Sequence, residues 1–122
     1  MAPMKKKANI LSLTEIEVEK IKDFGELNHY SKEEMLIYKG HVPKVSFVFL
    51  DGKMELQRNY ESLLVENFCI VGLHELVEEL PFKYSLKIFP GSKCIVLNKS
   101  SLVEIKNIQG GLGSVLANFP LV

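Results

Sequence analysis

Short apolar segments separated by turn residues dominate the chain from Tyr30 onward. Each segment is rich in strand-forming residues and is bounded by Gly, Pro, Asp or charged residues, a pattern typical of antiparallel β-structure. The sequence predicts strands at residues 35–38, 45–50, 53–57, 62–65, 84–89 and 94–97. Asp51-Gly52 separates two of these strands, and an Asp-Gly pair in such a position favours a tight two-residue hairpin with positive φ.

A short amphipathic helix is predicted before the strands. Thr14 with Glu17 three residues later is a capping-box signature, because the hydroxyl and the carboxylate can satisfy N–H groups at the start of a helix. Gly25 ends the segment. Between Thr14 and Gly25, the apolar residues Ile16, Ile21 and Phe24 lie close to helical spacing.

Two further helical pieces are expected later in the chain. Residues 74–79 form a helical turn that ends before Pro81, since the residue before a proline is biased away from helix. Ser100 and Ser101 can cap another short helix after Asn98. Closely spaced strands with a helix at each end predict a mainly β fold with flanking short helices. This would be a closed or double-sheet antiparallel roll, of about eight strands if it is a jelly roll.

The composition indicates one globular domain. A chain of 122 residues with 47% hydrophobic and 25% charged residues can bury one core without disulfides or metal. We expect residues 1–13 to form a flexible basic N-terminal tail and residues 14–122 to form a single domain. The longest apolar stretches, 45–50 and 68–73, fall far short of the ~20 residues needed to span a bilayer.

The balance of charges and the placement of reactive residues exclude several function classes. Lys plus Arg and Asp plus Glu both number 15, so no overall field attracts nucleic acid or an anionic membrane. Cys69 and Cys94 lack metal-ligand spacing, and without a secretion signal they indicate reduced thiols in a cytoplasmic protein. His29, His41 and His74 are isolated from one another, so no metal site is predicted. We assign no catalytic residue and expect no enzyme.

Glycines end two of the predicted strands, and their order is informative. Residues 30–40 end in Gly40, and the aromatic-apolar residues 47–56 run through Gly52. Gly72 is the next glycine along the chain. The later segments in the same order are 85–89 and 94–98. This order resembles the cyclic nucleotide-binding domain family over nearly the whole chain, and the resemblance implies a double-stranded β-roll in which Gly72 begins the phosphate-binding cassette.

The resemblance also implies which residues would form a ligand pocket. In the family, backbone N–H groups at a glycine turn and an Arg meet the cyclic phosphate, and a Glu after the glycine takes the ribose hydroxyl. Here Leu73 occupies the position of that Glu, and Phe82 falls at or near the position of the Arg. The candidate ligand-binding residues are the cassette positions Gly72, Leu73, His74, Glu75, Phe82, Lys83 and Ser85.

Two interpretations of the remaining polar residues stay open. Lys83 could act as a point charge and Glu75 could reach a ribose, or both are surface charges and His74 is a turn residue. A lysine does not reproduce the forked geometry of arginine. Two charge-assisted contacts, each worth about 1.5–3 kcal/mol, are missing, so cyclic AMP and cyclic GMP are possible ligands but are not favoured. No other cofactor is expected.

The sequence therefore predicts a non-catalytic regulatory module with a degenerate pocket that acts mainly through protein–protein interaction, with a protein partner or by self-association. The alternative is a sensor that binds a cyclic nucleotide or a related small anion in a non-standard way. Residues 110–122 contain apolar side chains that either form an interface or fold back over one mouth of the roll. Truncation after Ile108 would separate these two possibilities.

Overall fold

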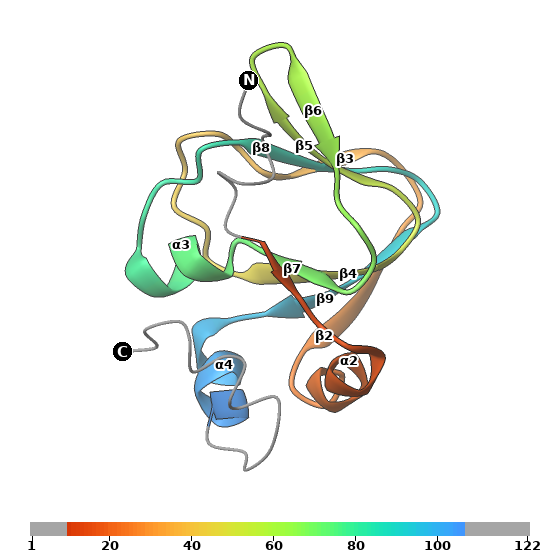
Figure 1. Cartoon of the computed structure of the whole chain (residues 1–122), viewed down its shortest axis with the longest axis vertical. Coiled ribbons are helices and arrows are strands. Elements are labelled where there is room, and N and C mark those ends of the chain that lie inside the picture. The colour runs from red at the N-terminus through yellow and green to blue at the C-terminus, as the bar shows by residue number, and fades with distance from the viewer. Residues whose placement is uncertain (1–9, 107–122) are drawn as a thin grey trace.

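Two antiparallel β-sheets face each other in the computed structural model, which describes residues 10–106 (Figure 1). The five-stranded sheet has the order β1 (Leu11–Ser12), β7 (Cys69–Val71), β4 (Ser46–Asp51), β9 (Ser92–Leu97) and β2 (Glu26–Tyr30). The four-stranded sheet has the order β3 (Glu34–Ile37), β8 (Ser85–Ile88), β5 (Met54–Arg58) and β6 (Glu61–Leu64). The prediction of a mainly β, double-sheet roll is confirmed.

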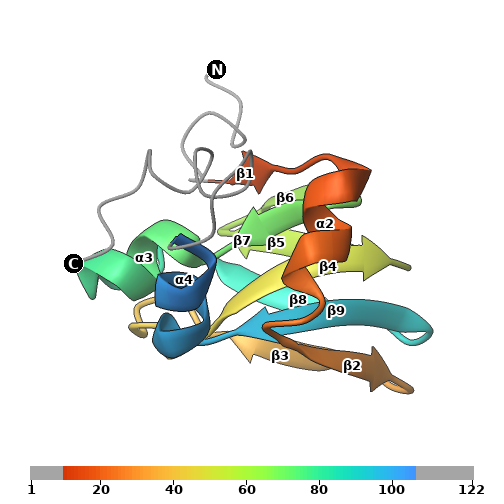
Figure 2. The same ribbon diagram turned by 90° about the horizontal axis from the view of Figure 1, so that it is seen from below.

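The described part of the chain also contains three short helices, α2 (Glu15–Ile21), α3 (Leu73–Glu78) and α4 (Lys99–Lys106). Helices α2 and α4 lie against the outer face of the five-stranded sheet, whereas α3 lies at one end of the roll (Figure 1 and Figure 2). Within residues 10–106, no helix has the length and apolar character needed to cross a bilayer.

Strand β4 separates two hydrophobic clusters because both of its faces are buried. Phe47 and Phe49 belong to an inner cluster shared by the two sheets. Val48, on the opposite face, joins an outer cluster that packs beneath the helices. A strand covered on both faces needs no polar alternation, which explains the continuous apolar run in this part of the sequence. The outer cluster consists of Leu13, Val18, Ile21, Val48, Ile70, Leu73, Leu76, Ile95, Leu97, Leu102 and Ile105.

The capping box predicted at the N-terminal helix is present. The Glu17 N–H donates to Thr14 Oγ1 at 3.2 Å, and the Thr14 N–H donates to Glu17 Oε1 at 2.7 Å. The buried face of the helix differs from the expectation, because Val18 and Ile21 are buried while Ile16 is 70% exposed. Thr14 and Glu17 therefore fix where the helix begins, and packing against the sheet decides which of its residues turn inward.

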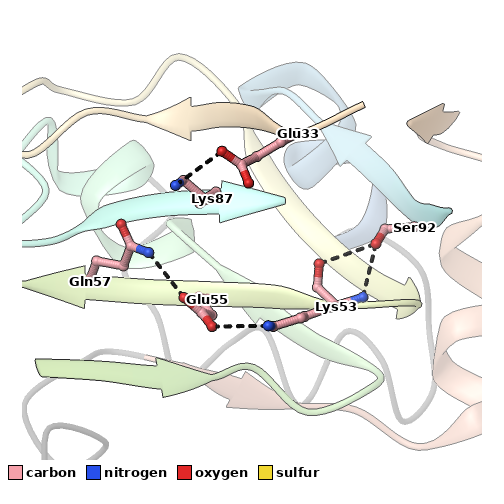
Figure 3. Close-up of polar contacts among 6 residues, drawn as sticks. All are labelled: Glu33, Lys53, Glu55, Gln57, Lys87 and Ser92. Carbon is pink, nitrogen blue, oxygen red and sulfur yellow. Dashed lines mark hydrogen bonds and ion pairs between the residues drawn. The ribbon is translucent and has the colours of Figure 1, made fainter. Parts of the chain in front are cut away.

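The predicted two-residue hairpin at Asp51-Gly52 is wrong. Strand β4 belongs to one sheet and β5 to the other, so the chain turns a corner between the sheets instead of folding back on itself. Gly52 does have positive φ, at 105°. Ser92 holds the corner, since its Oγ accepts from the Lys53 N–H at 2.9 Å and donates to the Lys53 carbonyl at 3.1 Å (Figure 3). An Asp-Gly pair indicates positive φ, but it does not specify which strands pair.

The sequence did not predict three of the strands. Strands β1 and β7 have only two and three residues, and β2 is an edge strand with little buried surface. Because Leu11–Ser12 pairs with β7 and Leu13 is buried, the sheet includes residues that precede Thr14.

The start of α4 also differs from the prediction. Asn98 caps this helix, since its Oδ1 accepts from the Ser101 N–H at 2.9 Å, so the cap is not Ser100 or Ser101. Residues 1–9 of the expected tail and the apolar residues 110–122 lie outside the described residues.

Both cysteines are buried free thiols, as predicted. Cys69 lies beside Ser12, with its Sγ 3.5 Å from the serine Oγ. Burial raises the pKa of the Cys94 thiol to about 12. The Cys94 thiol is therefore protonated in the folded protein at neutral pH, and it acts as an apolar component of the inner cluster.

Candidate functional site

A cavity of about 640 Å³ opens at the end of the roll beside α3. Its volume lies within the range of small-molecule pockets. The turn after β3, the end of β5 and the segment from α3 toward β8 form its wall. The lining residues are Lys39, Gly40, Arg58, His74, Glu75, Leu80, Pro81, Phe82 and Lys83. Four of the seven residues proposed from the sequence meet here, namely His74, Glu75, Phe82 and Lys83.

Gly72 and Leu73 lie outside the wall of this cavity. Gly72 has a φ of 85° directly before α3, and a Cβ there would lie 3.2 Å from Ile37 Cδ1. Glycine suits this left-handed and crowded position. Leu73 is fully buried in the outer cluster. The two residues therefore anchor α3, and neither presents a side chain to the cavity.

Phe82 is fixed in the wall by its backbone and its ring. Its N–H donates to the His41 carbonyl at 2.9 Å, and its carbonyl accepts from the Gly40 N–H at 2.8 Å. Its ring meets the Tyr84 ring edge-on, with centroids 6.0 Å apart, inside the inner cluster. Only 3% of Phe82 is exposed. Phe82 is thus an integral part of the core.

The polar residues proposed from the sequence are arranged around this aromatic wall. Glu75 is buried on α3, His74 is half-buried, and Lys83 is exposed. Ser85 does not line the cavity, but its Oγ accepts from the Lys39 N–H at 3.4 Å. Ser85 therefore positions the turn after β3, which forms one side of the opening.

Arg58 is the residue of this cavity that the sequence reasoning missed. It is the only arginine in the chain. Its guanidinium carbon lies 5.1 Å from the centroid of the Tyr84 ring, and its Nε is buried without a hydrogen-bond partner in the described structure. The sequence did contain a signal, because Arg58 stands two and four residues after the apolar Leu56 and Met54 of the same strand.

The cavity is basic. Three cations, from Lys39, Arg58 and Lys83, line it together with the carboxylate of Glu75 and the imidazole of His74. None of the three cations forms an ion pair with another residue between 10 and 106. The same part of the chain contains no cluster of His, Cys, Asp or Glu able to hold a metal ion.

A second recess of about 520 Å³ lies between the turn that contains Val42 and the start of α4. It holds an ion pair between Lys99 Nζ and Glu79 Oε2 at 2.8 Å. None of the residues proposed from the sequence lines it. The basic cavity beside α3 is therefore the candidate functional site.

The fold has close counterparts among solved structures, although no protein-family profile and no curated protein matches the chain. A protein described with a cyclic-GMP-dependent signalling pathway that regulates bacterial phytopathogenesis superposes with a TM-score of 0.77 at 14% identity, over 88% of this chain and 90% of that one. A putative cyclic nucleotide-binding protein from Geobacter metallireducens gives 0.62 at 20% identity, over 88% and 81%. The catabolite activator protein of Thermus thermophilus gives 0.60 at 15% identity, over 89% and 49%.

These likenesses show a common architecture. The paired sheets and the flanking short helices of this chain form the β-roll of cyclic nucleotide-binding domains, as the order of its glycines and strands indicated. At identities of 20% or less, the comparison concerns the fold alone.

Proposed function

We propose that this chain is a non-catalytic regulatory module with the cyclic nucleotide-binding fold, a degenerate nucleotide pocket and an output through protein contact. The burial of Phe82 is the observation on which the proposal rests. The resemblance places the phosphate-binding arginine at or near this position, and here an aromatic ring that is 3% exposed packs against Tyr84.

The expected loss of affinity for a cyclic nucleotide is large. A hydrogen bond to a charged group contributes about 1.5–3 kcal/mol, so the loss of one weakens binding about 10- to 150-fold. Leu73, at the position of the family's ribose-binding Glu, is buried in the outer cluster and faces no cavity. We therefore infer that two signature contacts of the family, one from the arginine and one from the glutamate, are absent here.

Calorimetric titration of the purified chain with cyclic AMP and with cyclic GMP tests this part of the proposal. We expect no saturable heat at micromolar nucleotide. A cooperative thermal melt of the same sample shows that the protein is folded. Saturable binding of either nucleotide at low micromolar concentration would contradict the degenerate pocket.

The burial of both thiols and the raised pKa of the Cys94 thiol support a non-catalytic role. A thiolate is the reactive form of cysteine, and burial raises the pKa of Cys94 to about 12. Cys69 is also buried.

Exposed apolar residues beside the candidate site support an output through protein contact. Tyr38 is 57% exposed, Val42 45% and Leu80 43%. Leu80 lines the basic cavity, whereas Tyr38 and Val42 both lie on the turn after β3. Apolar side chains gathered at one site on a surface indicate an interface.

Self-association is the form of protein contact that the purified chain can test directly. Sedimentation velocity over a range of concentrations would compare the parent with Tyr38→Ser and with Tyr60→Ser. Tyr60 is a matched control, because it is fully exposed at the turn between β5 and β6. We expect Tyr38→Ser alone to weaken association, and equal behaviour of the two variants would contradict an interface at Tyr38.

The second candidate function is a sensor of a small anion. The specific observation in its favour is the cavity beside α3, which three cations line. In this function, binding of the anion would regulate the protein contact. The pocket would bind this anion in place of a cyclic nucleotide.

A further inference from the structure

We propose that the cavity beside α3 binds the phosphate group of a small organic phosphomonoester, with Arg58 as its principal ligand and Lys39 and Lys83 as flanking cations. The proposal deepens the sensor function described above and rests on it. It assigns the anion site to the end of strand β5, where Arg58 lines the cavity.

The alternation along β5 directs the Arg58 side chain inward. Glu55 and Gln57 share the outer face of the four-stranded sheet, where Gln57 Nε2 donates to Glu55 Oε1 at 3.0 Å (Figure 3). Met54 and Leu56 lie on the other face, inside the roll, and both are fully buried. Arg58 continues this inner face, since residues two apart on a strand point the same way. Its guanidinium therefore lies at the mouth of the roll interior.

The guanidinium is held in place without being neutralised. Its Cζ lies over the Tyr84 ring, 5.1 Å from the ring centroid, and this contact with the aromatic face uses none of its N–H groups as hydrogen-bond donors to an acceptor atom. Its Nε is buried and has no hydrogen-bond partner within residues 10–106. Glu61, its cross-strand neighbour, forms no ion pair with it. A buried donor on a cation is costly unless a ligand satisfies it.

The charge of the cavity matches a phosphomonoester better than a cyclic phosphodiester. Among the described lining residues, Lys39, Arg58 and Lys83 provide three cations and Glu75 provides the one carboxylate, so the cations outnumber the carboxylates by two. A phosphomonoester carries about −1.5 to −2 charges at neutral pH, whereas a cyclic phosphodiester carries one negative charge. Arginine also offers the forked donor pair that fits two phosphate oxygens, and a lysine does not.

The remaining wall suits an organic group attached to the phosphate. Leu80, Pro81 and Phe82 are the apolar residues among those that line it. A pocket of about 640 Å³ has room for a sugar or a nucleoside. Inorganic phosphate would use only the cationic part of the site, so it should bind more weakly than a phosphomonoester with an organic body.

Calorimetric titration of the full chain with adenosine 5′-monophosphate, glucose 6-phosphate, inorganic phosphate and cyclic AMP tests the proposal. We expect saturable binding of at least one of the two phosphomonoesters, and tighter binding of that compound than of inorganic phosphate or cyclic AMP. Arg58→Gln should weaken its binding about tenfold or more, and Arg58→Lys should weaken it less. Lys93→Gln is the matched control, because Lys93 is an exposed lysine on β9 outside the cavity. The affinity of this variant for the phosphomonoester should equal that of the parent.

Amide chemical shifts make the result independent of the folding of any variant. With the phosphomonoester bound to the parent, the shifts that move should be those of residues 39–40, 58, 74–75, 80 and 82–83. Absence of binding by both phosphomonoesters would overturn the inference and leave the degenerate nucleotide pocket standing. Binding that Arg58→Gln and Arg58→Lys leave unchanged, or shifts that map elsewhere, would also overturn it. Tight binding of cyclic AMP would instead contradict the proposed function.

Discussion

Gly52 lies at the corner where the chain passes from β4 in one sheet to β5 in the other. Its φ of 105° is a conformation that L side chains rarely adopt. A Cβ at this position would collide with the side chain and the backbone of Ser92, the residue whose hydroxyl bonds both the N–H and the carbonyl of Lys53. Gly52→Ala therefore adds two separate costs, backbone strain and the displacement of Ser92.

Gly91→Ala separates these two costs. Gly91 has a φ of 83°, and a Cβ there would meet no atom within 4 Å, so only the strain applies. That strain is about 1–3 kcal/mol for each variant. Displacing Ser92 loses two hydrogen bonds of about 1 kcal/mol each. We therefore expect Gly52→Ala to be about 2 kcal/mol less stable than Gly91→Ala.

Thermal and urea unfolding followed by circular dichroism measure the difference. About 1 kcal/mol lowers the melting temperature of a domain of this size by about 4 °C. Gly52→Ala should thus melt about 8 °C below Gly91→Ala. If the two variants melt together, the corner does not depend on the contact between Gly52 and Ser92, and the reasoning is wrong.

Three further changes test other parts of the structure. Thr14→Ala removes the capping-box hydroxyl and should lower the free energy of unfolding by about 1 kcal/mol in urea titrations, whereas an unchanged midpoint would contradict the cap. Phe82→Arg places an unpaired charge in a buried site and should lower it by about 3 kcal/mol or more, while Phe82→Leu should cost far less; equal costs would contradict the burial of the ring. Burial raises the pKa of Cys94 from 9.0 to about 12. As the pH rises, the Cys94 thiol of the unfolded chain therefore loses its proton before the thiol of the folded protein does. Between these values the stability of the parent should fall by about 1.4 kcal/mol per pH unit more than that of Cys94→Ala, and parallel pH profiles would contradict the raised pKa.

The sequence predicted the strands whose apolar runs are bounded by turn residues, because those two features are local. It placed β4, β5, β8 and β9 within one or two residues of their observed bounds. It did not predict β2, since an edge strand with one sheet neighbour buries too little surface to show an apolar pattern. The partner of a strand is a non-local property, and so the two strands that meet at Gly52 were wrongly predicted to pair with each other.

The residues of the candidate site also divide into those that the sequence predicted and one that it did not. His74, Glu75, Phe82 and Lys83 were found because the resemblance follows the order of residues along one segment. Arg58 precedes that segment by more than a dozen residues and reaches the cavity only because β5 pairs with β8. Sequence reasoning that follows one motif does not see a ligand from a neighbouring strand, even where the strand's alternation points that residue inward.

The position of Arg58 determines what a bound anion would connect. Arg58 belongs to β5 of the four-stranded sheet, whereas His74 and Glu75 belong to α3, which is anchored by Leu73 and Leu76 in the outer cluster beneath the five-stranded sheet. In the proposed complex, Arg58 and the two flanking lysines hold the phosphate, and the organic group lies against Leu80, Pro81 and Phe82, which follow α3 along the chain. A ligand held from β5 and packed against the segment after α3 would make the position of that segment dependent on the ligand. This is the kind of local change that a regulatory module can transmit to a protein bound near Tyr38 and Leu80.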